Sequence, residues 1–250
     1  WNADDKTLTP ILYGLSRGQV ESIVDREIGY NSRPVIIVET MADTMYLNAF
    51  DKFLEDPNIS MNPLNIVAAY NKNSVLPLAI FYRNHGYNTF VLLDNTKESR
   101  DISTQLVANE FTKIQTIFFE HDSKALQSIE DYMLPDDYLY AVNQTYAIKL
   151  RKEGYVNLTN EIIKSKNKTG ILEGLESIWT ERKEDEWENF DSEEVCRYIC
   201  EKIAMNEAEF LTDKTKDRIR SLYRLIAERI RQQQNLLSNQ SSEKRRKMNV

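Results

Sequence analysis

Apolar and polar positions alternate in two different rhythms along the chain. Four short runs are continuously apolar and rich in β-branched residues, as expected of parallel strands buried on both faces: residues 34–38, 64–69, 89–93 and 114–119. Between these runs, apolar residues recur at helical spacing in three segments: residues 43–54, 75–84 and 100–111. Strands that alternate with helices of this length predict βαβ crossovers, and so an α/β fold with a parallel sheet flanked by helices.

After residue 122 the strand signal fades and the pattern becomes helical. Five helices are predicted there, at residues 136–153, 159–164, 170–182, 192–205 and 213–234. Ile219, Leu222 and Ile226 belong to an apolar stripe on the last of them, which indicates packing against a core. The chain is therefore expected to divide into an N-terminal segment (1–32), an α/β domain (33–122), a helical C-terminal region (123–236) and a disordered basic tail (237–250).

The composition is that of a soluble, globular chain. Of its 250 residues, 41% are hydrophobic and 28% are charged. No apolar run approaches the roughly 20 residues that a membrane-spanning helix needs, so we expect a cytoplasmic protein without membrane contact. The chain begins at Trp1 without an initiator methionine or a signal-peptide pattern, which leaves open that it is a fragment of a longer protein.

The net charge of −7 argues against a protein that simply coats nucleic acid, because phosphate contacts need clustered Lys and Arg. A local groove or a bound metal ion is still compatible with nucleic-acid binding. The one dense basic run, residues 244–247, lies in a tail rich in Ser, Asn and Gln. It is either a nucleic-acid contact or a solvated, mobile terminus, and the second interpretation is favoured.

Cys196 and Cys200 are four positions apart in a predicted helix, and so lie on the same side of it. Such a pair could begin a zinc site. However, no CxxC or HxxxH motif accompanies it, and His85 and His121 are far away in the sequence. Half-buried thiols in a reducing cytoplasm are therefore the favoured interpretation.

Three acidic residues stand where the predicted strands end. Glu39 ends the first strand, Asp43 lies one helical turn later, and Asp94 ends a neighbouring strand. The carboxyl ends of parallel strands form one edge of the sheet, where ligands bind. A single acid at such a position usually caps a helix or faces solvent. Three that converge predict a Mg²⁺ site, because Mg²⁺ prefers hard oxygen ligands.

The motifs around these acids resemble a known family. Residues 38–50 resemble the first TOPRIM motif of OLD-family (overcoming lysogenization defect) ATP-dependent nucleases, a VEG-x-x-D-x-x-YL pattern. Residues 91–96 fall where that family has a strand ending in D-x-D. Residues 128–139 and 141–146 look like its "IED-hydrophobic-Pro, YL, VN-x-x-Y" segment. The resemblance runs from about Arg33 to Ile230 and implies a TOPRIM-like sheet followed by a helical region.

The resemblance also implies a nuclease site with two Mg²⁺ or Mn²⁺ ions. Glu39, Asp43 and Asp94 would hold metal on one side, with Glu39 and Asp94 as the catalytic pair. Glu130 and Asp131 would hold metal on the other side. In such a site one ion activates water and the other stabilises the leaving 3′ oxygen. The alternative for Glu130 and Asp131 is a structural turn before Pro135.

Several family positions are substituted in this chain. Thr40 stands where the family has a glycine after the first Glu. Thr96 stands where it has the second acid of D-x-D, and a hydroxyl is a poorer metal ligand than a carboxylate. Residues 69–74 replace a Gly-rich turn after the second strand. Ser192 stands where the family has a Lys in an "fDK-x-x-VA" motif.

Two hypotheses follow for the function. The first is a metal-dependent endonuclease domain that acts on DNA or RNA in a bacterial or phage-related defence system under the control of an ABC-type ATPase. The second is a degenerate TOPRIM module that binds nucleic acid or the ATPase partner. The retained acids favour the first, and Thr40, Thr96 and Ser192 favour the second. No G-x-x-x-x-G-K-[ST] loop occurs, so the ATPase would be a removed domain, with 1–32 as the junction, or a separate subunit. The family resemblance also implies a homodimer or larger assembly.

Overall fold

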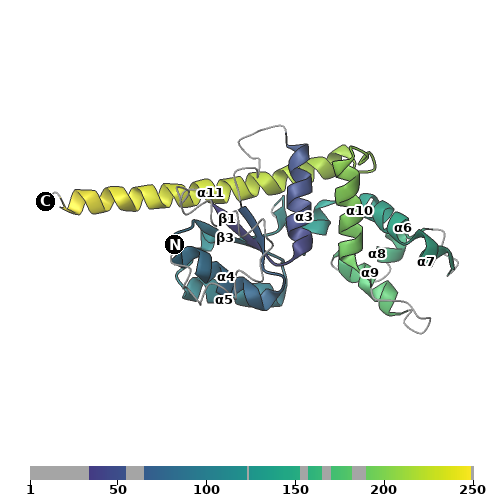
Figure 1. Ribbon diagram of the computed structural model, residues 1–250, viewed down its shortest axis with the longest axis horizontal. Coiled ribbons are helices and arrows are strands. Elements are labelled where there is room, and N and C mark those ends of the chain that lie inside the picture. Colours follow the sequence, from purple (N-terminus) through teal and green to yellow (C-terminus); the bar gives the residue numbers. More distant parts are fainter. Residues whose placement is uncertain are drawn as a thin grey trace, which may run out of the picture.

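The computed structural model describes residues 34–54, 65–122, 124–152, 157–164, 170–181 and 190–248 of the chain. A small parallel sheet lies at one side of this structure, several short helices lie at the other, and a long helix runs past the sheet (Figure 1). The predicted N-terminal segment, 1–32, lies outside the described residues.

Four parallel strands form the sheet, in the order β2-β1-β3-β4: β1 (Val35–Val38), β2 (Asn65–Ala68), β3 (Thr89–Leu93) and β4 (Thr116–Phe118). The central strand β1 pairs with β2 on one side and with β3 on the other, so that Ile37 is level with both Val67 and Val91. All residues of β1 and β3 are buried, as their continuously apolar sequences predict. The predicted α/β fold class is confirmed.

Helices cover both faces of the sheet because successive strand side chains point to opposite faces. Ile36 and Val38 join a core cluster with the helices α3 (Met41–Phe50), α10 (Ser192–Ala204) and α11 (Asp213–Met248). Val35 and Ile37 join a second cluster with α4 (Lys72–Asn84) and α5 (Lys97–Ala108). The helix that follows β1, α3, thus lies on one face of the sheet, and the helix that follows β3, α5, lies on the other face. The carboxyl ends of these two neighbouring strands form the topological switch point of the sheet.

The helical C-terminal region follows a short hairpin that the sequence pattern does not predict, β5 (Glu120–His121) with β6 (Lys124–Ala125). Its described residues form a 3₁₀ turn η3 and four helices ahead of α10 and α11: η3 (Ile129–Tyr132), α6 (Pro135–Thr145), α7 (Ala147–Lys152), α8 (Asn160–Lys164) and α9 (Ile171–Thr180). Its largest buried side chains, Trp179, Tyr138 and Tyr223, belong to the same apolar cluster as Ile36 of β1. The helical region and the sheet therefore share one core.

Two helices differ most from their predicted extents. The predicted helix 136–153 is interrupted at Tyr146, which separates α6 from α7 and whose hydroxyl accepts a hydrogen bond from the Asp191 backbone N–H. The last helix, α11, continues to Met248, where a disordered tail from residue 237 is predicted. That tail contains neither Gly nor Pro, and its Leu, Gln, Glu, Lys and Arg residues have good helix propensity, so it extends the helix.

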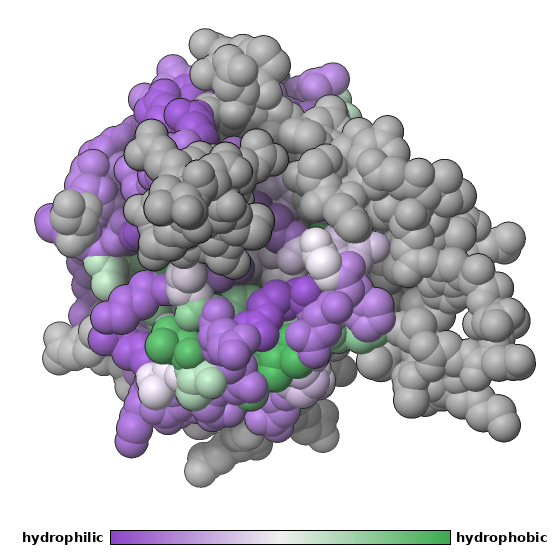
Figure 2. All heavy atoms as spheres, turned by 90° about the vertical axis from the view of Figure 1, so that its left-hand side faces the viewer, coloured by the Kyte–Doolittle hydropathy of each residue, from purple (hydrophilic) through white to green (hydrophobic). Residues whose placement is uncertain are grey.

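Among the described residues, no helix is long and apolar enough to cross a membrane. Seen from the left-hand side of Figure 1, the described surface is mostly hydrophilic, with a smaller group of hydrophobic side chains between the hydrophilic ones (Figure 2). Both cysteines are free thiols on α10. Cys196 is buried against the carbonyl oxygen of Ala42, and Cys200 is half-buried.

Candidate functional site

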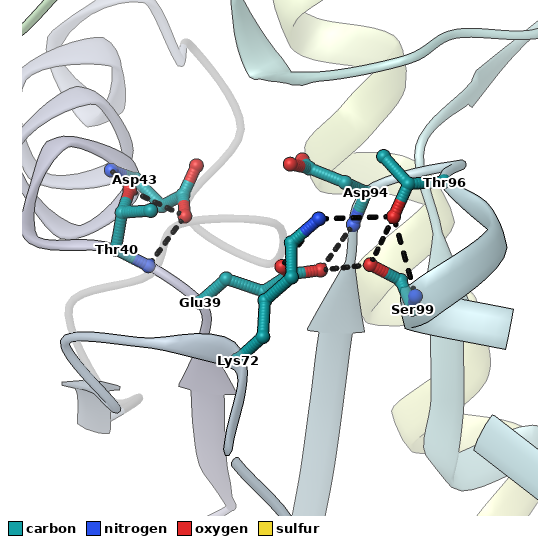
Figure 3. A network of polar contacts seen from close by, with 7 residues as sticks. All are labelled: Glu39, Thr40, Asp43, Lys72, Asp94, Thr96 and Ser99. Carbon is teal, nitrogen blue, oxygen red and sulfur yellow. Dashed lines mark hydrogen bonds and ion pairs between the residues drawn. The ribbon is translucent and has the colours of Figure 1, made fainter. Parts of the chain in front are cut away.

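Glu39 and Asp94 meet at the switch point of the sheet. The backbone N–H of Asp94 donates a hydrogen bond of 2.9 Å to Oε1 of Glu39, and the hydroxyl of Ser99 donates one of 2.7 Å to the same oxygen (Figure 3). Glu39 is only 1% exposed, and its second oxygen, Oε2, is buried without a hydrogen bond, 3.8 Å from Nζ of Lys72. A buried carboxylate oxygen without a hydrogen bond is costly, so this position would be stabilised by a cation.

Asp43 lies on the first turn of α3, on the same edge of the sheet. Its Oδ2 accepts hydrogen bonds from the backbone N–H of Thr40 (2.9 Å) and from the Thr40 hydroxyl (2.8 Å). The Thr40 hydroxyl oxygen in turn accepts from the backbone N–H of Asp43, which completes a capping box at the start of α3. Thr40 has an extended backbone, φ −126°, which any residue adopts. The residue that replaces the family's glycine thus serves as a helix cap.

The carboxylate of Asp94 faces the other acids. Figure 3 shows it on the side of its strand toward Asp43. Burial raises the pKa of Asp94 to about 9, repulsion from Asp43, Glu39 and Glu130 adds to the rise, and Lys72 opposes it. Such a shift means that the ionised form of Asp94 is disfavoured unless a cation joins the site.

Glu130 brings a fourth carboxylate from the helical region. It lies in η3 and is 4% exposed. Burial raises its pKa to about 7, and repulsion from Asp43 adds to this, while a hydrogen bond from the Ser128 hydroxyl lowers it. Burial also raises the pKa of Asp43 to about 6, with Thr40 lowering it and Glu39 raising it. Glu130 also adds to the raised pKa of Asp94, so these four buried or largely buried acids act on one another electrostatically. We call them the acidic cluster: Glu39, Asp43, Asp94 and Glu130.

Asp131 has a different role from Glu130. Its Oδ2 accepts from the backbone N–H of Gln127 (2.9 Å), and its Oδ1 accepts from the backbone N–H of Ile171 (3.2 Å) at the start of α9. Both carboxylate oxygens are therefore occupied by backbone donors. Asp131 is therefore not part of the acidic cluster. Of the predicted metal-binding pair, Glu130 belongs to the cluster, while Asp131 holds the start of α9.

Lys72 and Ser99, which no motif in the sequence indicated, complete the polar network around Glu39. Nζ of Lys72 donates to Oγ1 of Thr96 over 3.0 Å, and the Thr96 and Ser99 hydroxyl oxygens are 2.8 Å apart (Figure 3). Thr96 also caps α5 by accepting from the backbone N–H of Ser99. The Thr-x-x-Ser spacing after a strand and a lysine in residues 69–74 were the only sequence signals for this network.

Ser192, the third substituted family position, begins α10 next to its cap, Asp191, whose carboxylate accepts from the backbone N–H of Glu193. Ser192 therefore lies at the end of a helix that packs on α3 through Cys196 and Ala42. Its proposed role as a substituted active-site position stays a prediction.

The acidic cluster fits a divalent cation in charge and donor type, because carboxylate oxygens are the ligands that Mg²⁺ and Mn²⁺ prefer. As the side chains stand in the described part of the chain, no three His, Cys, Asp or Glu residues are close enough together to hold a metal ion. Thr40 holds one oxygen of Asp43, and Ser99 and Asp94 hold one oxygen of Glu39. A shared ion would therefore require a change of rotamer at one or more of the four acids.

No model of a known protein family matches the sequence, and no curated protein matches it. Solved structures similar to the fold include two C-terminal regions of OLD proteins. That of the Xanthomonas campestris pv. campestris OLD protein is 16% identical, with a TM-score of 0.41 over 82% of this chain and 96% of the other. That of the Burkholderia pseudomallei OLD protein is 17% identical, with a TM-score of 0.37 over 80% of this chain and 97% of the other.

Proposed function

We propose that this chain is a TOPRIM domain of the OLD family and that its acidic cluster binds Mg²⁺ or Mn²⁺ to hydrolyse phosphodiester bonds of DNA or RNA. One observation carries the proposal. Glu39 and Asp94 are hydrogen-bonded at the switch point of a parallel sheet, Asp43 and Glu130 are buried near enough to raise the pKa of Asp94, and three of these four acids have a raised pKa: Asp43, Asp94 and Glu130. Buried like charges of this kind need a cation or protons to remain together.

The helices around the cluster support a phosphate ligand. α3, α4 and α5 begin three or four residues after the ends of β1, β2 and β3 respectively, with Thr40, Asn71 and Thr96 as their N-caps. Their N-terminal ends therefore converge on the same sheet edge, and a helix N-terminus carries partial positive charge that attracts anions. Acids to hold a metal and helix ends that attract phosphate are both present at this edge.

Glu39 and Asp43 each have one carboxylate oxygen fixed by hydrogen bonds and one oxygen left over. A bound divalent ion would lower the pKa of water and stabilise charge on the leaving oxygen. Glu39 is fixed by Asp94 and Ser99 through Oε1, so Oε2 is the oxygen left to face a cation. Asp43 is fixed through Oδ2 by Thr40 and offers Oδ1. These hydrogen bonds hold one oxygen of each carboxylate and leave the other oxygen for a cation, once the rotamer change that a shared ion requires has taken place.

Cleavage of labelled single- and double-stranded DNA and RNA tests the proposal, with Mg²⁺ or Mn²⁺ and with EDTA in parallel. Glu39→Gln keeps the volume of the side chain but removes its charge, and we expect it to reduce cleavage at least ~100-fold, the size typical of losing a group that stabilises transition-state charge. Glu209→Gln, an exposed glutamate outside the cluster, is the matched control and should cut like the unaltered protein. Cleavage that survives Glu39→Gln unchanged would exclude the acidic cluster as the active site.

A second function is a degenerate TOPRIM module that binds nucleic acid or the ATPase partner without hydrolysis. The contact of Lys72 with Thr96 and Glu39 favours it, because a cation of the protein itself already stands beside the first acid. In that case the protein cuts nucleic acid with neither Mg²⁺ nor Mn²⁺. A filter-binding assay should then measure the same affinity for nucleic acid with EDTA as with metal.

The proposed OLD-family membership also suggests control by an ABC-type ATPase, self-assembly and a role in antiviral defence. Co-expression of this chain with a candidate ATPase, followed by size-exclusion chromatography with light scattering, tests the first two. A chain that remains a monomer and does not co-elute with the ATPase would contradict them.

A further inference from the structure

Lys72 lies in an unusual place for a lysine. It is the first residue of α4, and the first turn of this helix contains no acidic residue. A positive charge in the first turn is unfavourable, because the N-terminal end of a helix is itself electropositive. Lys72 turns from its own helix toward the acids, and its side chain is 38% exposed. Its two polar contacts are Thr96 and Glu39 (Figure 3).

The hydrogen bonds around Lys72 have only one consistent direction. Ser99 has a single hydroxyl proton, which it donates to Oε1 of Glu39. The 2.8 Å contact between Ser99 and Thr96 must then use the Thr96 proton. Thr96 in turn accepts from Nζ of Lys72 and from the backbone N–H of Ser99. The chain therefore runs from the Lys72 ammonium through Thr96 and Ser99 to the carboxylate of Glu39.

This direction determines what Thr96 can do. Its one proton and both of its lone pairs are engaged, so it has no lone pair left for a metal ion while the chain of hydrogen bonds is intact. A hydroxyl is in any case a weaker ligand than a carboxylate. The Lys72 ammonium, held by Thr96, therefore supplies a positive charge beside Glu39.

On the basis of the proposed function, we propose that the Lys72 ammonium is a built-in counter-cation that occupies one cation position of the acidic cluster. The cluster then takes one divalent ion, on the side of Asp43, Asp94 and Glu130, and not two. Lys72 and one divalent ion bring three positive charges to the four carboxylates, which leaves a single negative charge. A second divalent ion would have to approach Glu39 against the ammonium 3.8 Å from its free oxygen.

Counting bound Mn²⁺ on the whole chain tests the proposal independently of any cleavage. Isothermal titration calorimetry gives the number of Mn²⁺ ions bound per chain. The loss of the electron paramagnetic resonance signal of free Mn²⁺ on binding gives the same number independently. We expect one ion in the unaltered protein and two in Lys72→Met, which keeps a similar length but removes the charge. Lys72→Arg keeps the charge and should still bind one. Thermal denaturation of each variant reports whether the fold is retained.

The outcomes separate this inference from the proposed function. The same non-zero number of ions in the unaltered protein and in Lys72→Met would overturn the role of Lys72 and leave the metal-binding cluster standing. No ion in either would overturn both. No ion in the unaltered protein but one in Lys72→Met would overturn the metal-dependent function and support Lys72 as the cation that replaces the metal.

Discussion

The backbone N–H of Asp94 donates to Oε1 of Glu39 over 2.9 Å, so the two acids at the ends of β1 and β3 are bonded through the main chain of one and the side chain of the other. This contact fixes Glu39 without using the carboxylate of Asp94. That carboxylate is left to face Asp43 and Glu130, whose charges raise its pKa.

The stability of the metal-free protein should fall as the pH rises from about 4 to about 9. Asp43, Glu130 and Asp94 have pKa values of about 6, 7 and 9 in the fold, above the ordinary values for these side chains. The folded state therefore binds more protons than the unfolded state in this pH window. The contribution of these protons to the free energy of unfolding is complete below about pH 4 and is lost as the pH rises through the pKa of each acid in the folded state. Glu39, Asp131 and Lys72 are the other charged groups that act on these acids.

Thermal melts in EDTA between these pH values measure the effect, and Mg²⁺ should restore much of the loss at the alkaline end because it replaces the protons. Asp94→Asn removes the group with the largest shift and should flatten the pH profile. A melting temperature that rises with pH in this window, or a profile identical in Asp94→Asn, would contradict the described electrostatics.

Glu130 and Asp131 are adjacent but should respond oppositely to substitution. Asp131→Ala removes two hydrogen bonds from backbone N–H groups, and we expect it to cost about 2 kcal/mol of unfolding free energy, as for hydrogen bonds to a charged acceptor. Its Mn²⁺ affinity should change little. Glu130→Gln should keep the stability near neutral pH or raise it, but weaken Mn²⁺ binding. Urea denaturation and Mn²⁺ titration of both variants decide the matter, and equal loss of metal binding in both would return Asp131 to the cluster.

Thr40→Ala tests whether the residue after Glu39 is a cap. Loss of the capping box should cost about 1 kcal/mol. It should also raise the pKa of Asp43 further, because the Thr40 hydroxyl bond lowers that pKa in the fold. Carboxyl titration by NMR measures the second effect. Thr104→Ala, an exposed threonine that bonds to Arg100 within α5, is the matched control, and a similar stability loss there would argue against a specific cap.

Thr96→Asp places an acid where the resembled D-x-D motif has one, but alone it should not create a second metal site. Lys72 is 3.0 Å from the Thr96 oxygen and would pair with the new carboxylate. Only the double variant Lys72→Met with Thr96→Asp should bind a second Mn²⁺ more tightly than Lys72→Met does. Equal binding of the second ion by the double variant and by Lys72→Met would show that position 96 lies outside any metal site.

The parts of the site that depend on strand topology were predictable. Glu39 and Asp94 follow buried apolar runs, and neighbouring parallel strands bring their carboxyl ends to one edge whatever the loop sequences are. Asp43 follows by helical spacing. The continuously apolar character of β1 and β3 was sufficient for these placements, because it reflects burial on both faces.

The parts that depend on distant packing were not predictable. Nothing near Asp131 in the sequence indicates that it accepts from Ile171, 40 positions away. A single lysine after β2 has no local signature either, and its partner Thr96 lies 24 positions further on. The helical extension of α11 was missed for another reason: polar composition was taken as disorder, although the segment lacks the helix-breaking residues Gly and Pro.

The turn η3 that carries Glu130 is held in place by the far end of the chain. Arg218 of α11 donates to the carbonyl oxygen of Asp131 across 87 positions, while Asp131 holds the start of α9. The sheet supplies Glu39 and Asp94, but the fourth carboxylate arrives only once α9 and α11 have docked. The complete cluster therefore depends on the packing of α9 and α11, and local opening of α11 would displace Glu130 while β1 and β3 remain paired.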